Sequence, residues 1–247
     1  MTEIEEQKFI WLGVYGHPDD ETSASAGTMV KLANRGHQVY VVTATGGELG
    51  TLGTGGTKIR RKDLATVREA ELKANMDSFG VNPPFMLRYV DQELDKEDPD
   101  ILSLKVLDIM HMVKPDVIST FGPSGISNHP DHIAIHKSTL IAYDKYLSSS
   151  DKPRPLLIYA SIPADIAEMY DLQLSEIEKN MDIVIDINDT ISYKIEGLKN
   201  YRSQEDAQEF AAHLSERPGP HLETFAISDS SPNDWETYPI VNFLRSI

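Results

Sequence analysis

Hydrophobic positions along the first two thirds of the chain alternate between two periods. Short apolar runs rich in β-branched residues predict buried strands, because a strand covered on both faces has no polar side. Between these runs, apolar residues recur at helical spacing. For example, Ala26, Met29, Val30 and Ala33 share one face of a predicted helix, and Gly36 is placed to end it. The predicted strands cover residues 9–16, 38–45, 85–90, 116–122 and 156–162.

This alternation of strands and helices predicts an α/β fold, which is Rossmann-like, with a mostly parallel sheet and helices on both faces. After about residue 163 the pattern is less regular. Residues 182–187 predict one more strand, residues 192–203 predict a helix, and the last thirty residues are rich in loops. No linker or repeat interrupts the chain, so residues 1–247 are expected to form a single domain. Within it we expect an α/β core (1–163) and a less regular C-terminal part (164–247).

Composition narrows the classes of function. The 247 residues include no cysteine, so a transition metal would have to bind His, Asp or Glu side chains. The net charge of −16 disfavours nucleic acid and anionic membranes as partners. No apolar stretch approaches the roughly 20 residues of a transmembrane helix. The acidic start also lacks the basic segment and cleavage site of a signal peptide, so we expect a cytoplasmic protein.

Two short motifs each follow a predicted strand. The motif GHPDDE (residues 16–21) comes directly after the first strand, and NHPDH (residues 128–132) follows the fourth strand after a short loop. Open α/β sheets place their ligand crevice at the carboxyl ends of strands. One His-Pro-Asp alone is usually just a turn. Two of them in one crevice would crowd imidazoles and carboxylates together, which favours a cation. Two histidines and one carboxylate with an open fourth position describe a catalytic zinc site.

The two motifs resemble those of the LmbE/PIG-L family of zinc-dependent N-acetylglucosaminyl deacetylases. The resemblance covers about the first 140 residues and weakens afterwards. It implies that His17, Asp20 and His132 bind zinc, for which Fe2+ is an alternative with the same ligands.

The resemblance also implies three catalytic residues. Asp19 would be the general base, His129 would stabilise the oxyanion and protonate the leaving amine, and Asp131 would orient His129. These roles agree with the chemistry of each residue type, because a carboxylate that is not a ligand can accept a water proton and a histidine can supply one near neutral pH. Asp19 could instead, or in addition, cap the following helix. Glu21 either orients a metal ligand or only favours the helix N-terminus.

Three features nearby allow two interpretations each. The glycine-rich loop 46–56 is a flexible loop, or a substrate-facing loop that brings Glu48 near the sugar, as the resemblance implies. Arg68 forms an ion pair with Glu71 one helical turn away, or it helps to hold the substrate. The basic cluster KIRRK (residues 58–62) is a solvated loop, or it attracts an anionic part of the substrate.

One position departs from the family pattern. Some members carry a tyrosine two residues before the first histidine of HPDH, where this chain has Ser127. If the tyrosine has a role here, another residue must fill it, and Tyr201 is a weak candidate.

The sequence therefore predicts a metal-dependent amide hydrolase that deacetylates a small N-acetylglucosamine-type sugar. One alternative is an amidase that acts on a sugar-thiol conjugate or another amide. A second alternative is a non-catalytic nucleotide-binding module, although the glycine pattern lacks the usual phosphate-binding signatures. Relatives of this type often assemble, so a homo-oligomer is an alternative to a monomer.

Overall fold

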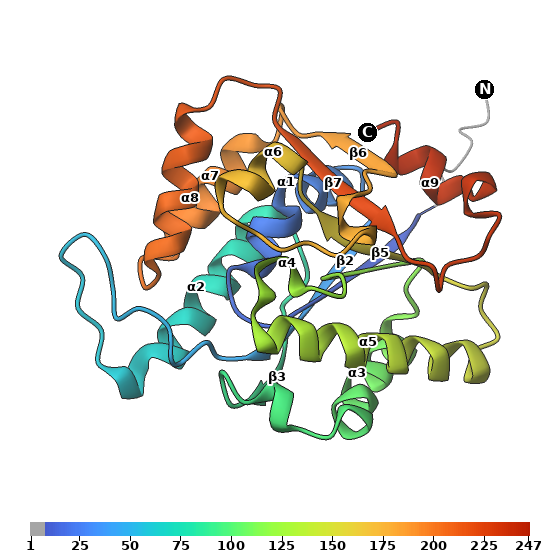
Figure 1. The fold of residues 1–247 in the computed structure, drawn as a ribbon, viewed down its shortest axis with the longest axis horizontal. Coiled ribbons are helices and arrows are strands. Elements are labelled where there is room, and N and C mark those ends of the chain that lie inside the picture. Colours follow the sequence, from blue (N-terminus) through green and yellow to red (C-terminus); the bar gives the residue numbers. More distant parts are fainter. Residues whose placement is uncertain (1–7) are drawn as a thin grey trace.

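The central feature of the fold is a seven-stranded sheet within residues 8–247, the part of the chain that the computed structural model describes (Figure 1). The acidic start considered above for a signal peptide lies largely in residues 1–7, outside the described residues. The order across the sheet is β3-β2-β1-β4-β5-β7-β6. The strands are β1 (Ile10–Tyr15), β2 (Gln38–Thr45), β3 (Phe85–Tyr89), β4 (Val117–Thr120), β5 (Leu156–Ser161), β6 (Ile183–Asp186) and β7 (Leu222–Ile227).

The five strands from β3 to β5 pair in parallel, which confirms the predicted mostly parallel sheet. All of them were predicted within one or two residues of their ends. The antiparallel strand β7 was missed, because the last thirty residues were interpreted as loops. In the structure, β7 lies between β5 and β6 and joins them into one sheet.

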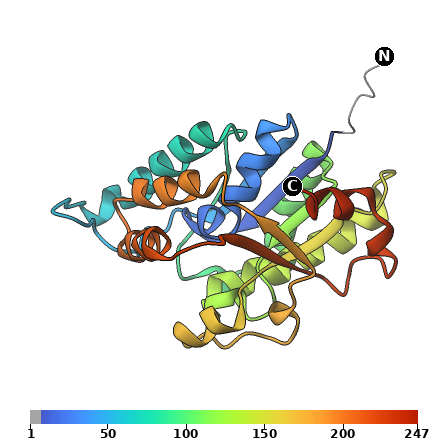
Figure 2. The same cartoon turned by 90° about the horizontal axis from the view of Figure 1, so that it is seen from above.

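Helices cover both faces of the sheet, as Figure 2 shows. One layer contains α1, α2, α7 and α8, and the opposite layer contains α3 and α5. The α-helices are α1 (Asp20–Asn34), α2 (Leu64–Phe79), α3 (Pro99–Val113), α4 (Gly125–Asn128), α5 (Pro130–Ser149), α6 (Ala164–Met169), α7 (Ile191–Asn200), α8 (Glu205–Glu216) and α9 (Pro239–Leu244). The short 3-10 helices are η1 (Arg61–Asp63), η2 (Leu94–Lys96), η3 (Ile177–Lys179) and η4 (Trp235–Thr237). None of the helices in residues 8–247 is both long and apolar enough to cross a membrane.

The helix that follows β1 is interrupted one turn after its start. Ser25 has non-helical backbone angles, and the hydroxyl of Ser25 bonds back to the carbonyl of Glu21. The N–H groups of Gly27 and Thr28 then need acceptors, and the buried carboxylate of Glu223 from β7 accepts both at 3.0 and 2.7 Å. Glu223 therefore caps the second part of α1, so that the first turn of α1 can take its own direction.

We predict that Glu223→Ala destabilises the protein by about 3–5 kcal/mol. The buried Nζ of Lys194 lies 2.8 Å from Glu223, so the variant leaves a buried charge and two helix N–H groups unpaired. Urea unfolding measures the change. Glu196→Ala is the control. Because Glu196 pairs with Lys199 on the surface, this variant should lower the free energy of unfolding by less than about 1 kcal/mol. Equal stabilities of the two variants would contradict the capping role.

Candidate metal centre

Residues from the two His-Pro-Asp motifs meet at the carboxyl ends of β1 and β4. His17 and Asp20 follow β1 through Gly16, and His132 lies in the first turn of α5. Gly16 leaves room for this approach, because a Cβ atom there would make tight contacts, 3.0 Å from Cδ2 of His132 and 3.4 Å from Oδ2 of Asp20. The sequence thus brings together the three residues predicted to bind the metal.

Three potential ligand atoms face one another at the centre of this site. The Nδ1 atom of His17 lies 3.1 Å from Nε2 of His132 and 3.5 Å from Oδ2 of Asp20. Nε2 of His132 lies 3.3 Å from the same Asp20 oxygen. Donor atoms around a tetrahedral zinc ion with bonds of about 2.0–2.2 Å are about 3.3–3.6 Å apart. The spacing therefore fits one small cation.

The hydrogen-bond partners of the second ring nitrogen in His17 and His132 show which nitrogen of each ring carries the proton. Nε2 of His17 faces two carboxylates, Asp131 at 3.1 Å and Asp91 at 3.2 Å, to which it donates its proton. Nδ1 of His132 faces the backbone carbonyl of Gly125 at 3.0 Å, so it also acts as a donor. In these tautomers the lone pairs of both rings are directed at Oδ2 of Asp20, which also accepts the backbone N–H of His17 at 2.7 Å. Such a buried set of acceptors is costly unless a cation lies among them.

The pKa directions reflect the same crowding. Burial lowers the pKa of His17, but hydrogen bonds to Asp131, Asp20 and Asp91 outweigh it and raise this pKa well above the usual value. Burial raises the pKa of Asp20, yet its contacts with His132 and His17 hold it well below the ordinary range. The protein thus stabilises positive charge at this point.

The side chain of Asp131 does not orient His129 as predicted, because its carboxylate is bound elsewhere. Within residues 8–247, its carboxylate binds Nε2 of His17 and accepts the backbone N–H groups of Gln92 and Leu94. The ring of His129 uses Nδ1 to accept the N–H of Asp131, and so caps α5. Asp131 is therefore a partner of a predicted metal ligand. His129 still borders the site, since potential ligand atoms of His17, His129 and His132 lie within 4.8 Å of one another.

Asp91 is the site residue that the sequence did not indicate. Its carboxylate contacts Nε2 of His17 with one oxygen and the N–H of Leu49 with the other, at 2.8 Å. It follows β3, the strand at the edge of the parallel sheet. The available signal was a carboxylate directly after the third predicted strand, but no motif marks this position. Asp91 links the metal site to the glycine-rich loop.

Asp19 lies beside the predicted ligands in an unusual backbone conformation. Its φ of 104° places it in the left-handed region, which costs an L-residue about 1–2 kcal/mol. Its side chain makes no capping hydrogen bond to α1 and instead accepts Nη2 of Arg68 at 2.7 Å. Burial raises the pKa of Asp19 well above its usual value, and Arg68 opposes the shift. Asp19 thus occupies the N-cap position of α1 without capping the helix through its side chain, and the carboxylate remains available next to the site.

A family model described as GlcNAc-PI de-N-acetylase, the PIG-L family, matches residues 12–143. This match covers more than half of the chain and contains both motifs. The chain belongs to the PIG-L family. The predicted family is thus confirmed, and every predicted metal ligand lies inside the matched segment.

Relatives of this PIG-L chain are named as deacetylases and as an amidase. A probable N-acetyl-alpha-D-glucosaminyl L-malate deacetylase 2 from Bacillus cereus is 30% identical over 197 residues, 79% of this chain and 84% of that protein. A mycothiol S-conjugate amidase from Streptomyces coelicolor is 30% identical over 173 residues, 60% of this chain and 59% of the amidase. The match therefore spans less than two thirds of the amidase.

A solved structure shares the fold. The N,N'-diacetylchitobiose deacetylase from Pyrococcus horikoshii, in complex with an inhibitor, superposes with a TM-score of 0.68 and 20% identity. The superposition covers 95% of this chain and 88% of that one. At 20% identity this similarity supports the predicted fold, but it does not show which reaction this chain catalyses.

The glycine-rich loop of the PIG-L chain is fastened beside the site. Oε1 of Glu48 accepts the N–H of Asp91 at 3.0 Å, and Arg61 donates to the carbonyls of Glu48 and Gly50. One residue of the basic cluster thus serves to hold the loop, which neither interpretation of that cluster anticipated. Arg68 is buried and binds the carbonyls of Pro18 and Gly47 as well as Asp19.

Two interpretations from the sequence are wrong: the ion pair between Arg68 and Glu71, and Tyr201 as a substitute for the family tyrosine. Glu71 accepts the N–H and hydroxyl of Ser203 instead of pairing with Arg68. Tyr201 is fully buried and donates its hydroxyl to Oε1 of Glu21 at 2.7 Å, so it cannot reach a substrate. At the position of the family tyrosine, the hydroxyl oxygen of Ser127 lies 3.2 Å from Nδ1 of His132.

The loop that orients His132 is held by one buried carboxylate. Glu178 of η3 accepts the N–H groups of Ser124 and Ile126 and the hydroxyl of Ser124, on either side of Gly125. The carbonyl of Gly125 is the one that accepts Nδ1 of His132. Burial raises the pKa of Glu178, but hydrogen bonds from Ser124 and Ser175 outweigh it and hold the pKa below its ordinary value.

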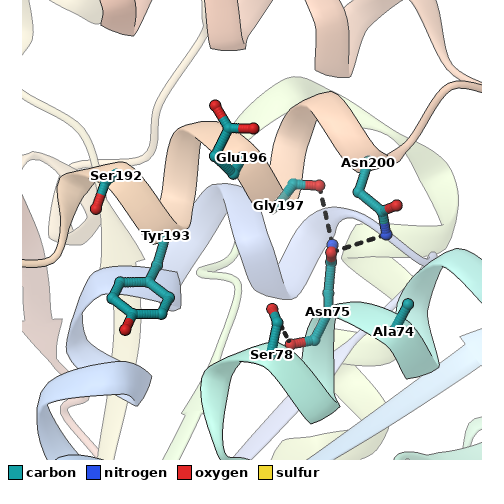
Figure 3. A pocket seen from close by; sticks show the side chains of 8 residues that line it. All are labelled: Ala74, Asn75, Ser78, Ser192, Tyr193, Glu196, Gly197 and Asn200. Carbon is teal, nitrogen blue, oxygen red and sulfur yellow. Dashed lines mark hydrogen bonds between the residues drawn. The ribbon is translucent and has the colours of Figure 1, made fainter.

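A separate groove of about 410 Å3 lies between α2 and α7 (Figure 3). Asn75 is buried in its lining and bonds to the carbonyl of Gly197 and the side chain of Asn200. The groove shares no lining residue with the metal centre. Its polar groups are largely used to join the two helices, so we assign the chemistry to the His-Asp cluster.

We predict that Glu178→Gln lowers stability by about 1.5–3 kcal/mol at pH 7, because an ionised acceptor of several hydrogen bonds is lost. The folded pKa is depressed, so this contribution is present above the unfolded pKa of about 4.3 and fades as pH falls through the folded pKa. Urea unfolding of both proteins at pH 7 and below pH 4 measures this. A difference that stays constant with pH would contradict the assignment.

Proposed function

We propose that this chain is a zinc-dependent hydrolase that removes the acetyl group from an N-acetylglucosamine-type substrate. The observation that carries the proposal is the convergence of His17 Nδ1, Asp20 Oδ2 and His132 Nε2, which lie 3.1–3.5 Å from one another. These three residues would hold Zn2+, or Fe2+ as an alternative that the same ligands accept. When bound, the metal supplies Lewis acidity that polarises an amide carbonyl and acidifies a water molecule.

The side chains around this point suit the proton transfers of amide hydrolysis. Asp19, held by Arg68, would accept the proton of the attacking water as general base. His129 accepts a backbone N–H at Nδ1, so its proton is on Nε2, from which it could donate a hydrogen bond to the oxyanion. The proton that Asp19 takes from water would then pass to the departing nitrogen, because a neutral ring that lost its only proton would be a strongly basic anion. A carbon–oxygen bond forms, the carbon–nitrogen bond breaks, and acetate and an amine leave.

The relatives support a sugar-linked amide as substrate. The Bacillus cereus relative is named for an N-acetylglucosaminyl malate, and the Streptomyces coelicolor relative is named for a mycothiol conjugate. An amidase of sugar-thiol conjugates is therefore the second candidate. Glu48 beside the site is proposed to face the sugar. Arg68 is proposed to act on substrate only through Asp19, because its guanidinium is buried against the protein.

Other parts of the sequence-based interpretation remain predictions. These are a cytoplasmic location and a homo-oligomer. The nucleotide-binding alternative is less well supported, because the carboxylates of Asp19, Asp20, Asp91 and Asp131 near the loop would repel phosphates.

We predict that Asp19→Asn keeps the metal but lowers kcat by about 10²–10⁴-fold, because the amide cannot accept a water proton. Metal content and release of amine from N-acetylglucosamine derivatives measure the two effects, and bulkier amides tested in parallel separate a deacetylase from an amidase. Turnover by Asp19→Asn at the wild-type rate would show that Asp19 is not the base. Zinc-loaded wild type that hydrolyses none of the acetylated sugars would rule out the sugar assignment.

We predict that His132→Ala weakens zinc binding by more than the roughly 10–100-fold that is typical when a hydrogen-bonding partner of a ligand is removed. His136→Ala is the matched control. It lies one turn further along α5, is equally buried, and bonds to the carbonyl of Phe121. Competition with a chromogenic chelator measures both affinities. Equal zinc affinities for the two variants would mean that the proposed ligand set is incorrect.

A further inference from the structure

The strained backbone conformation of Asp19 is stabilised by contacts with other side chains. With φ at 104°, Asp19 adopts the left-handed region that favours glycine, and its side chain makes no hydrogen bond to α1 that would fix this conformation. Residues in such regions persist only where their surroundings determine them, and they concentrate at functional sites. The contacts that determine Asp19 therefore bear on the position of the proposed base.

One of these contacts is a hydrogen bond to the backbone. Oε2 of Glu21 accepts the N–H of Asp19 at 3.0 Å. This N–H points in the direction set by the left-handed conformation, so the bond would be lost if the residue relaxed to an ordinary helical or extended conformation. Arg68 holds the carboxylate of the same residue at 2.7 Å. Asp19 is thus fixed at both ends, through its backbone and through its side chain.

The carboxylate of Glu21 is itself fixed by Tyr201. The hydroxyl of Tyr201 donates to Oε1 of Glu21 at 2.7 Å, and Thr22 donates to the same oxygen. Glu21 and Tyr201 are both 0% exposed, so neither is available to substrate. Tyr201 follows α7, far outside the segment 12–143 that the family model matches. A residue from the C-terminal part therefore reaches the first motif.

We propose that Glu21 and Tyr201 are positioning residues that hold the Asp19 backbone in its left-handed conformation and so aim its carboxylate at the site of reaction. The inference rests on the proposed function, in which Asp19 is the general base. It gives Glu21 a role that neither sequence-based interpretation included, since its carboxylate acts on the base and not on a metal ligand or the helix terminus.

The test compares Tyr201→Phe with the wild-type protein. Removing the hydroxyl leaves the ring in place and frees one side of Glu21. We expect the Asp19 amide to exchange with solvent at least about 10-fold faster, as measured by NMR on protein labelled with 15N-aspartate. We also expect kcat to fall by about 10–100-fold, while KM and bound zinc stay within about twofold. Glu21→Gln, which loses one acceptor oxygen, should change the same quantities in the same direction.

Tyr143→Phe is the matched control. Tyr143 is also 0% exposed and donates its hydroxyl to a backbone carbonyl, that of Pro155, at 2.8 Å. It should lower Tm to a similar extent without changing Asp19 exchange or kcat. If Tyr201→Phe behaves like this control, Tyr201 only packs and the inference is wrong. The exchange experiment needs no substrate, so absence of turnover in the wild type would count against the proposed function alone.

Discussion

The arrangement of this site depends on three lone-pair atoms that face one another in a buried space. Two imidazoles and one carboxylate can remain so close only if their protons are directed outward and positive charge lies between them. Neighbouring groups direct both ring protons outward. Two carboxylates accept a hydrogen bond from His17, and the Gly125 carbonyl accepts one from His132. The glycine at position 16 leaves room for the approach. The fold around the site therefore orients the imidazole rings of His17 and His132.

Much of this could be predicted from the sequence, because two kinds of local signal agree. Apolar runs located the five parallel strands. One His-Pro-Asp turn directly follows the first of them, and the other follows the fourth after a short loop. Strand ends in a parallel sheet meet at one edge, so the two motifs were expected in one crevice, while the resemblance supplied the ligand set His17, Asp20 and His132. The family resemblance then added roles that strand order cannot supply, such as the separate task of Asp19.

The parts that could not be predicted depend on contacts between distant segments. Asp91 has no motif around it, and its role follows only from the position of His17 Nε2. Tyr201 was a candidate to replace the family tyrosine, but its position at the end of α7 places its ring in the core beside Glu21. The partner of Asp131 was wrong because a histidine at a helix start turns its ring to the backbone, which leaves the carboxylate free for another strand end. Strand β7 was missed because its pairing is antiparallel and its neighbours are far away in sequence.

The position of β7 has a consequence for how the protein forms during synthesis. Within residues 8–247, β6 is attached to the sheet only through β7, although β7 is synthesised about forty residues later. Until β7 emerges from the ribosome, the edge of β5 is unpaired and the second part of α1 lacks its cap from Glu223. The first motif is therefore synthesised long before the strand that gives it its final support. Such late closure of long-range contacts is slow and leaves strand edges open in the nascent chain.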